Sequence, residues 1–134
     1  MPTLRTYSIF ICHDWEYSGD YYRVCEFLAD AANFKWENRS VPEHDPLDSD
    51  RQLRYNLRNQ IRPAHVMLIL AGMYTARSRW MDWEMEFARM IGKPIIGVAP
   101  WGNRVLPRVV QKNASEIVGW RASSIVDAIR RHGR

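Results

Sequence analysis

Hydrophobic positions along the chain fall into short apolar runs, separated by stretches in which apolar residues recur every three or four positions. The most apolar runs are residues 7–12, 65–71 and 94–98. Runs of this length without polar alternation are typical of strands buried on both faces of a parallel sheet. Residues 34–41 and 116–120 predict two weaker strands, which makes five in all.

Helical spacing lies between the first and second predicted strands and again between the second and third. The first stretch carries the apolar set Tyr22, Val24, Cys25, Leu28 and Ala29. In the second stretch Leu53, Leu57 and Ile61 repeat every four residues. Residues 48–50 offer a capping side chain there, and Pro63 ends the pattern. Both stretches predict amphipathic helices.

A third helix is predicted over residues 78–91, and a last one over residues 123–131. The third helix has an apolar face made of Met81, Met85, Ala88 and Ile91. Gly92 follows as its C-cap. The stretch before residue 116 is compatible with a further short helix.

Strands that alternate with helices predict βαβ units and a parallel sheet covered on both faces. We therefore expect an α/β fold: one flavodoxin-like three-layer domain spanning residues 1–134, with a parallel five-stranded sheet of order 2-1-3-4-5. Ligands of such sheets bind beyond the carboxyl ends of the strands, where strand order reverses. Here that point lies between strands one and three. His13, Asp14 and Trp15 follow strand one, and residues 40–48 can border the same crevice.

Composition adds limits on class and location. The 134 residues are 46% hydrophobic and 25% charged, which suits an ordinary globular domain with one core. Cys12 and Cys25 fit small buried side chains in a reducing compartment better than a disulfide. The N-terminus lacks a signal-peptide pattern, and the longest apolar stretch, residues 66–73, is too short to cross a bilayer. We expect a cytoplasmic protein without a membrane partner.

The formal charge of +4 does not by itself indicate nucleic acid, because the arginines are scattered. The cluster at residues 130–134 suits the negative end of a helix dipole. We therefore expect no nucleic-acid partner. The four histidines are dispersed, so no metal site is expected. The sequence lacks a P-loop, a dinucleotide-binding glycine pattern and a C-x-x-C pair. Strand three ends in Ala-Gly-Met, without the acceptor aspartate of a phosphoacceptor receiver.

The most informative segment is Ser-Arg-Trp-Met-Asp-Trp-Glu-Met at residues 78–85, followed by Lys-Pro-Ile-Ile-Gly-Val at residues 93–98. It resembles the Ser-x-Trp-Cys-x-x-Glu-Leu and Lys-Pro-Ile-Ile patterns of Toll/interleukin-1 receptor (TIR) domains, with Met81 and Met85 in place of cysteine and leucine. Residues 7–13, Tyr-Ser-Ile-Phe-Ile-Cys-His, resemble the family's first strand, from which Ser8 and Cys12 depart.

Shorter matches extend this resemblance over nearly the whole chain. They are Phe34-Lys35-Trp36, Ser40-Val41-Pro42, Asp45-Pro46, Pro100-Trp101-Gly102 and Val118-Gly119-Trp120. This set is most similar to the small microbial TIR-like branch that includes the Thoeris antiphage TIR proteins.

The resemblance implies that Glu84 corresponds to the catalytic glutamate of NAD-consuming TIR domains. Cleaving the bond between nicotinamide and ribose builds an oxocarbenium-like centre, which a nearby carboxylate can stabilise. Nicotinamide leaves neutral, so no strong general acid is needed. Water as acceptor gives ADP-ribose, and an internal nucleophile gives a cyclic isomer. NAD is then the substrate, and no cofactor is expected.

The resemblance also implies a set of substrate-binding residues: His13, Asp14, Trp15, Ser40, Asp45 and Trp80. Simpler explanations remain open. His13 and Asp14 can form only a turn. Trp80 can belong to the core, and Glu84 can be a solvated helix residue that pairs with Arg77 or Arg79.

Two functions follow from the resemblance. The first is an NAD-cleaving enzyme that makes an ADP-ribose-derived signal in antiphage defence. It self-associates through TIR surfaces, and a separate effector protein responds to the product. The second is a non-catalytic TIR adapter, in which Glu84 only supports packing. The resemblance implies that the proline-bracketed loop at residues 42–46 makes contacts between domains, and a purely structural connector remains open.

Overall fold

The computed structural model describes residues 5–13, 19–40, 49–70, 79–99 and 107–133. It contains an all-parallel five-stranded sheet of order β2-β1-β3-β4-β5, which confirms the predicted topology. The strands are β1 (Thr6–Cys12), β2 (Lys35–Asn38), β3 (Val66–Leu70), β4 (Ile95–Val98) and β5 (Glu116–Val118). The helices are α1 (Gly19–Asp30), α2 (Asp50–Ile61), α3 (Arg79–Met90), α4 (Arg108–Asn113) and α5 (Ala122–His132).

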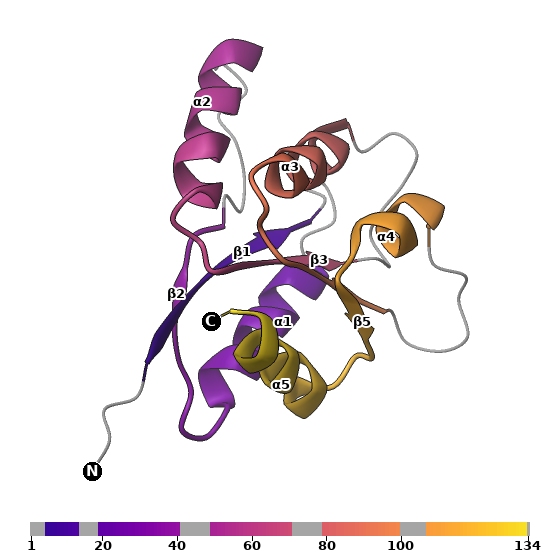
Figure 1. Cartoon of the computed structure of the whole chain (residues 1–134). Helices are drawn as coiled ribbons and strands as arrows, with labels where there is room; N and C mark the ends of the chain where they lie inside the picture. Colours follow the sequence, from indigo (N-terminus) through magenta and orange to yellow (C-terminus); the bar gives the residue numbers. More distant parts are fainter. Residues whose placement is uncertain (1–4, 14–18, 41–48, 71–78, 100–106, 134) are drawn as a thin grey trace.

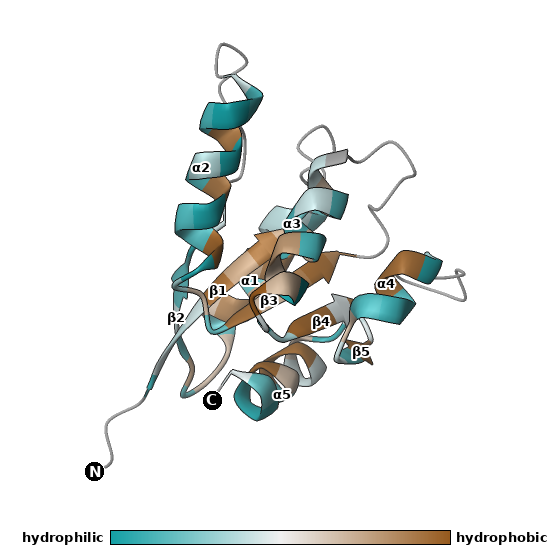
Figure 2. Cartoon of the chain, turned by 45° about the horizontal axis from the view of Figure 1, so that its top comes forward, coloured by the Kyte–Doolittle hydropathy of each residue, from teal (hydrophilic) through white to brown (hydrophobic). Residues whose placement is uncertain are grey.

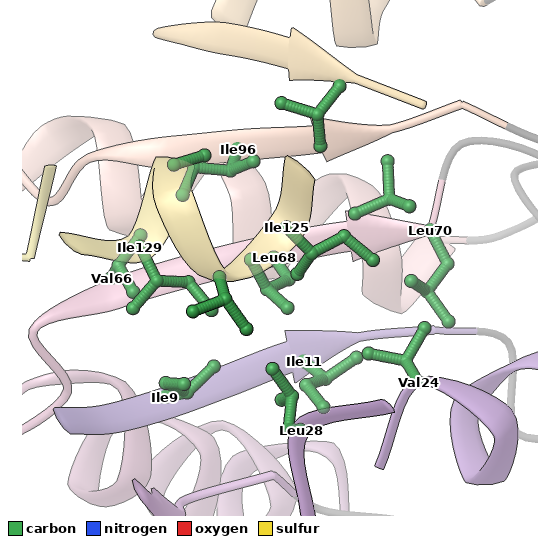
Figure 3. Close-up of a cluster of buried hydrophobic side chains, with 14 of the residues drawn as sticks. Ile9, Ile11, Val24, Leu28, Val66, Leu68, Leu70, Ile96, Ile125 and Ile129 are labelled. Atoms are coloured by element: carbon green, nitrogen blue, oxygen red, sulfur yellow. The ribbon is translucent and has the colours of Figure 1, made fainter. Parts of the chain in front are cut away.

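The helices form two layers that cover opposite faces of the sheet (Figure 1). Helices α1 and α5 cover one face, where the buried cluster includes Ile9 and Ile11 of β1 (Figure 3). Helices α2, α3 and α4 cover the other face, where Phe10 and Cys12 of β1 are buried. The alternation of side chains along β1 therefore decides which residues of this strand meet α3.

Local hydrogen bonds mark the start of α2 and the end of α3. The Ser49 hydroxyl accepts a hydrogen bond from the Gln52 amide at 3.1 Å, which caps α2 as the sequence predicts. Helix α3 ends at Met90 and is followed by a turn at Gly92, whose φ of 75° lies in the left-handed region. The amides of Gly92 and Lys93 bond back to Arg89 and Ala88 at 3.1 and 2.8 Å, which is the Schellman arrangement. Figure 2 shows β3 and β4 and most of β1 in the hydrophobic colour, whereas the edge strand β2 is hydrophilic.

Some predicted core positions are wrong. In α1 the buried tyrosine is Tyr21, while Tyr22 is 56% exposed and Ala29 is exposed as well. The Tyr21 hydroxyl accepts a hydrogen bond from Asn38 at 2.8 Å, and this contact favours the orientation of α1 that buries Tyr21. Ile91 is 40% exposed and lies in the turn after α3 rather than on the buried face of the helix.

The predicted second strand, residues 34–41, is also too long, since β2 ends at Asn38. It lies at one edge of the sheet and pairs only with β1. Cys25 is half-buried rather than buried, and both cysteines are free thiols. The arginines of the last turn of α5 confirm that the basic cluster ends a helix. Within the described residues, no helix combines the length and the apolar character needed to span a bilayer.

Candidate functional site

The candidate site lies at the carboxyl end of β1, an inner strand that pairs with both β2 and β3. Cys12 is the last residue of this strand and lies opposite Ile69 of β3. Helix α3 packs on the same end of β1. The strand order reverses between β1 and β3, so this is the position at which an open parallel sheet binds its ligands.

Glu84 of α3 is directed inward at this place. It is 2% exposed and stands among buried residues of the same helix, Met81, Met85 and Ala88. Its carboxyl group and the Cys12 thiol act on each other's pKa. The Cys12 sulfur is also 3.7 Å from the backbone oxygen of Met81, one turn earlier on α3. A solvated Glu84 on the outer face of the helix is therefore excluded.

The environment disfavours charge on both groups. Burial raises the pKa of Glu84 well above its usual range, and the hydrogen bond from Cys12 only partly opposes this shift. Burial also raises the pKa of the Cys12 thiol, and the nearby Glu84 and Asp82 carboxylates add to this rise. Cys12 consequently stays a protonated hydrogen-bond donor, and Glu84 is a carboxyl group that water cannot easily stabilise.

His13 directly follows β1 but belongs to the opposite face of the sheet. It is 2% exposed, and its ring stacks on Tyr21 of α1 with centroids 4.1 Å apart and planes inclined by 13°. Its Nδ1 is 3.0 Å from the Ile11 carbonyl oxygen. Because a carbonyl oxygen only accepts, Nδ1 carries the hydrogen. One face of the His13 ring is thus already covered by Tyr21.

Ser40 ties the end of the β2 segment to β1. Its hydroxyl accepts a hydrogen bond from the Ile11 amide at 2.9 Å. Its own amide donates to the Asn38 side chain at 2.9 Å. The other end of the Asn38 amide donates to the Tyr21 hydroxyl at 2.8 Å. Ser40, Asn38 and Tyr21 therefore form one hydrogen-bonded group that reaches His13 through the stacked ring of Tyr21.

Trp80 lies one helical turn before Glu84. It is half-buried against the α2–α3 side of the core, and its ring meets that of Trp83 edge-on at 6.2 Å. Trp83 in turn stacks on Phe87 at 5.4 Å. These contacts give Trp80 a packing role, whatever else it does.

The structure thus brings four of the side chains predicted for the site, together with Cys12, to the two sides of one strand. Cys12, Glu84 and Trp80 belong to its α3 side, and His13 and Ser40 to its α1 side. The predicted positions Asp14, Trp15 and Asp45, the loop at residues 42–46 and Trp101 lie outside the described residues.

Sequence reasoning missed three members of this site: Cys12, Tyr21 and Asn38. Cys12 follows Phe10 by two positions, and that period alone puts it on the face that α3 covers. Tyr21 precedes Val24 by three residues and Leu28 by seven, a helical spacing compatible with its burial, but Tyr22 has the same spacing to Cys25 and Ala29. No comparable sequence signal marks Asn38. Among the described residues, no group of three potential ligands could hold a metal ion.

The parallel sheet has the order expected from the resemblance to TIR domains, and Glu84 lies on the helix after its third strand. The family model described as "Thoeris protein ThsB, TIR-like domain" matches residues 10–105, more than half of the chain, and the chain therefore belongs to this family. It is accordingly a TIR-domain protein of the Thoeris defence context.

Other comparisons concern the fold alone. A 2-deoxyribosyltransferase from Bacillus psychrosaccharolyticus superposes with a TM-score of 0.61 at 11% identity, covering 90% of each chain. The CMP N-glycosidase BcmB of Clostridium botulinum superposes with a TM-score of 0.56 at 14% identity, covering 92% of this chain and 98% of its own. No curated protein matches the chain significantly.

Proposed function

We propose that this TIR-like domain cleaves NAD between nicotinamide and ribose, and so makes an ADP-ribose-derived signalling nucleotide for antiphage defence. The observation that carries the proposal is the buried carboxyl group of Glu84 at the carboxyl end of β1. It occupies the ligand-binding end of the sheet, and it is aligned with the glutamate of the TIR sequence pattern.

The chemistry that this carboxyl group supports is electrostatic. The bond from ribose C1′ to the nicotinamide nitrogen breaks, and its electron pair leaves with the ring, which becomes neutral. Positive charge then develops on the ribose. A carboxylate in a water-poor site stabilises that charge more strongly than one in water, because little solvent screens it. Water or a nucleophile of the same NAD molecule attacks C1′ and completes the reaction.

Substrate binding also explains how the buried carboxyl group of Glu84 becomes ionised. In the empty protein, burial disfavours its charged form. The nicotinamide ring of bound NAD carries a positive charge, and an opposite charge nearby lowers the pKa of a carboxyl group. Bound NAD thereby favours the ionised Glu84 carboxylate. This carboxylate then stabilises the positive charge that develops when NAD is cleaved.

The remaining site residues are proposed to bind and orient NAD. Asp14, Trp15 and Asp45 contact the nucleotide from the two sides of the crevice. Trp80 supports the flat ring of the substrate near Glu84. His13 and Ser40 stiffen the end of β1, in agreement with their contacts to the Ile11 backbone.

Two proteins of similar fold are named for chemistry at a related bond, one as a 2-deoxyribosyltransferase and one as a CMP N-glycosidase. Their low identity limits the likeness to the fold. They support the proposal only in that such a sheet can serve nucleoside and nucleotide substrates.

A non-catalytic adapter remains the second candidate, and the near-complete burial of Glu84 is compatible with it. However, a carboxyl group whose pKa is raised by burial weakens the fold at neutral pH. A packing role would be served better by an uncharged side chain, and this favours the catalytic proposal. In the catalytic role, the protein associates with itself and a separate effector responds to the product. NAD is its substrate rather than a cofactor, and its free thiols suit the cytoplasm.

Chromatography of NAD incubated with the purified protein tests the proposal. We expect free nicotinamide and an ADP-ribose-derived product, whose isomer mass spectrometry and a reference set identify. Glu84→Gln should abolish both while the circular dichroism spectrum stays unchanged. Intact NAD at high protein concentration, with an added extract of infected cells as a possible trigger, favours the adapter instead.

A further inference from the structure

We propose that Cys12 is a positioning residue for Glu84: its thiol donates to the Glu84 carboxylate when that group is ionised, and to the Met81 carbonyl when it is not. The link to catalysis rests on the proposed function above. The switch of hydrogen-bond acceptor does not, because it depends only on the folded chain.

Among the described residues, the Met81 oxygen and the Glu84 carboxyl group are the acceptors near the thiol. Cys12 is fully buried at the end of β1, and its sulfur lies 3.7 Å from the Met81 oxygen. Glu84 follows Met81 by three residues, so it lies on the same side of α3, and it is buried beside the same cluster as Cys12. Hydrogen bonding from the Cys12 thiol lowers the pKa of its carboxyl group. Both side chains are almost completely removed from solvent. Water therefore competes poorly for the single thiol proton.

The charge of Glu84 decides between the two acceptors. Hydrogen bonds to an ionised acceptor are about twice as strong as those to a neutral one. An ionised Glu84 therefore takes the thiol proton in a hydrogen bond and is held toward β1. A protonated Glu84 offers a weaker acceptor and has a hydrogen of its own to donate. The thiol then turns to the Met81 carbonyl.

Among the residues that the structure describes, few other charges act on this pair. From α3, the Asp82 carboxylate acts on Cys12. From β3 and α2, the buried residues that face the same cluster are apolar, with Met67, Ile69, Leu53 and Leu57 among them. Among the described residues, Cys12 is thus the polar side chain that acts on Glu84 from outside its own helix.

Infrared spectroscopy of the S–H stretch tests the switch without any assay of activity. A Cys25→Ala protein leaves Cys12 as the single thiol. We expect its S–H band to move to lower frequency as pH rises and Glu84 ionises, because the hydrogen bond strengthens. The band of Cys25→Ala/Glu84→Gln should not move. A band that ignores pH, or that moves equally in both proteins, overturns the proposal.

Activity then tests the positioning role, with serine and alanine as matched replacements. Cys12→Ala should lower kcat/KM about fivefold to tenfold on the acidic side of the pH profile and much less on its plateau, since loss of a donor disfavours the anion. Cys12→Ser keeps a donor and should restore most of this loss. An equal loss of kcat/KM at every pH, or failure of Cys12→Ser to restore activity, contradicts the positioning role of Cys12. If the wild-type protein releases no nicotinamide, the infrared result still decides the switch.

Discussion

At Glu84 the requirements of folding stability and of the proposed catalytic function conflict. Its carboxyl group is 2% exposed, and the described residues give it little more than the Cys12 thiol as a polar partner. In the folded protein its pKa is raised by burial, whereas in the unfolded chain it is ordinary, at about 4.3. Between these two values the folded state binds the proton more tightly. Folding stability therefore falls as pH rises through this window.

Glu84→Gln should remove this loss. Below about pH 4 the two proteins should unfold at similar temperatures, because glutamine resembles a protonated glutamate. Above the raised pKa of Glu84, the variant should be the more stable, by about 1.4 kcal/mol for each unit by which folding raises that pKa. Thermal melts of both proteins across this pH range measure the difference. A variant that is less stable at neutral pH would show that the ionised carboxylate has partners that stabilise it.

The pH dependence of catalysis should differ between the free protein and the complex. The acidic limb of kcat/KM reports the raised pKa of Glu84 in the free protein. The limb of kcat reports the complex, in which the cationic nicotinamide ring lowers the pKa of Glu84. We therefore expect the kcat limb at the lower pH. Limbs that coincide would argue that the substrate charge does not face Glu84.

At the scale of elements, α3 places Glu84 through its two ends and its inner face. The face made of Met81, Met85 and Ala88 anchors the helix on the sheet. The Schellman turn at Gly92 ends the helix and directs the chain into β4. These features follow local rules, and for that reason the sequence predicted α3 to within a residue at each end.

Replacing Gly92 by alanine should strain this turn. The φ of 75° disfavours a side chain, although no atom lies within 4 Å of the added Cβ. We expect a loss of about 1 kcal/mol in the free energy of unfolding, measured with urea. Gly119→Ala is the matched control, since its Cβ also meets open space and its φ is not positive. The control should be neutral or slightly stabilised. Equal effects of the two variants would contradict the conformational explanation.

At the scale of the whole molecule, the strand order and the two-sided core could be predicted because hydrophobic period and crossover handedness leave few alternatives. The face of α1 that is buried could not be predicted. Tyr21 and Tyr22 are equal in the sequence pattern, and a distant partner, Asn38, distinguishes them. Hydrophobic periodicity also could not predict that Glu84 is buried, because carboxylates normally face water. It was the sequence motif that singled out this residue.

The two faces of the sheet should separate stability from activity. Ile129 is buried on the α1–α5 face and Met85 on the α3 face. Replacing either by alanine should lower the free energy of unfolding by about 2–5 kcal/mol. Nicotinamide release per folded molecule should survive in Ile129→Ala and fall in Met85→Ala, whose side chain packs beside Glu84 on α3. Rates normalised to the folded fraction measure this, and equal losses would contradict the one-sided site.

The most direct test of the account compares nicotinamide release by the wild-type protein, Glu84→Gln and Glu86→Gln. Glu86 lies two residues further along α3 and is exposed, so it controls for the loss of a carboxylate from this helix. Measurements at high protein concentration allow for an assembly that orders the site. We predict that Glu84→Gln loses at least about 10²-fold in kcat, while Glu86→Gln keeps nearly the full rate. A Glu84→Gln protein that is folded and releases nicotinamide at the wild-type rate would contradict the central claim.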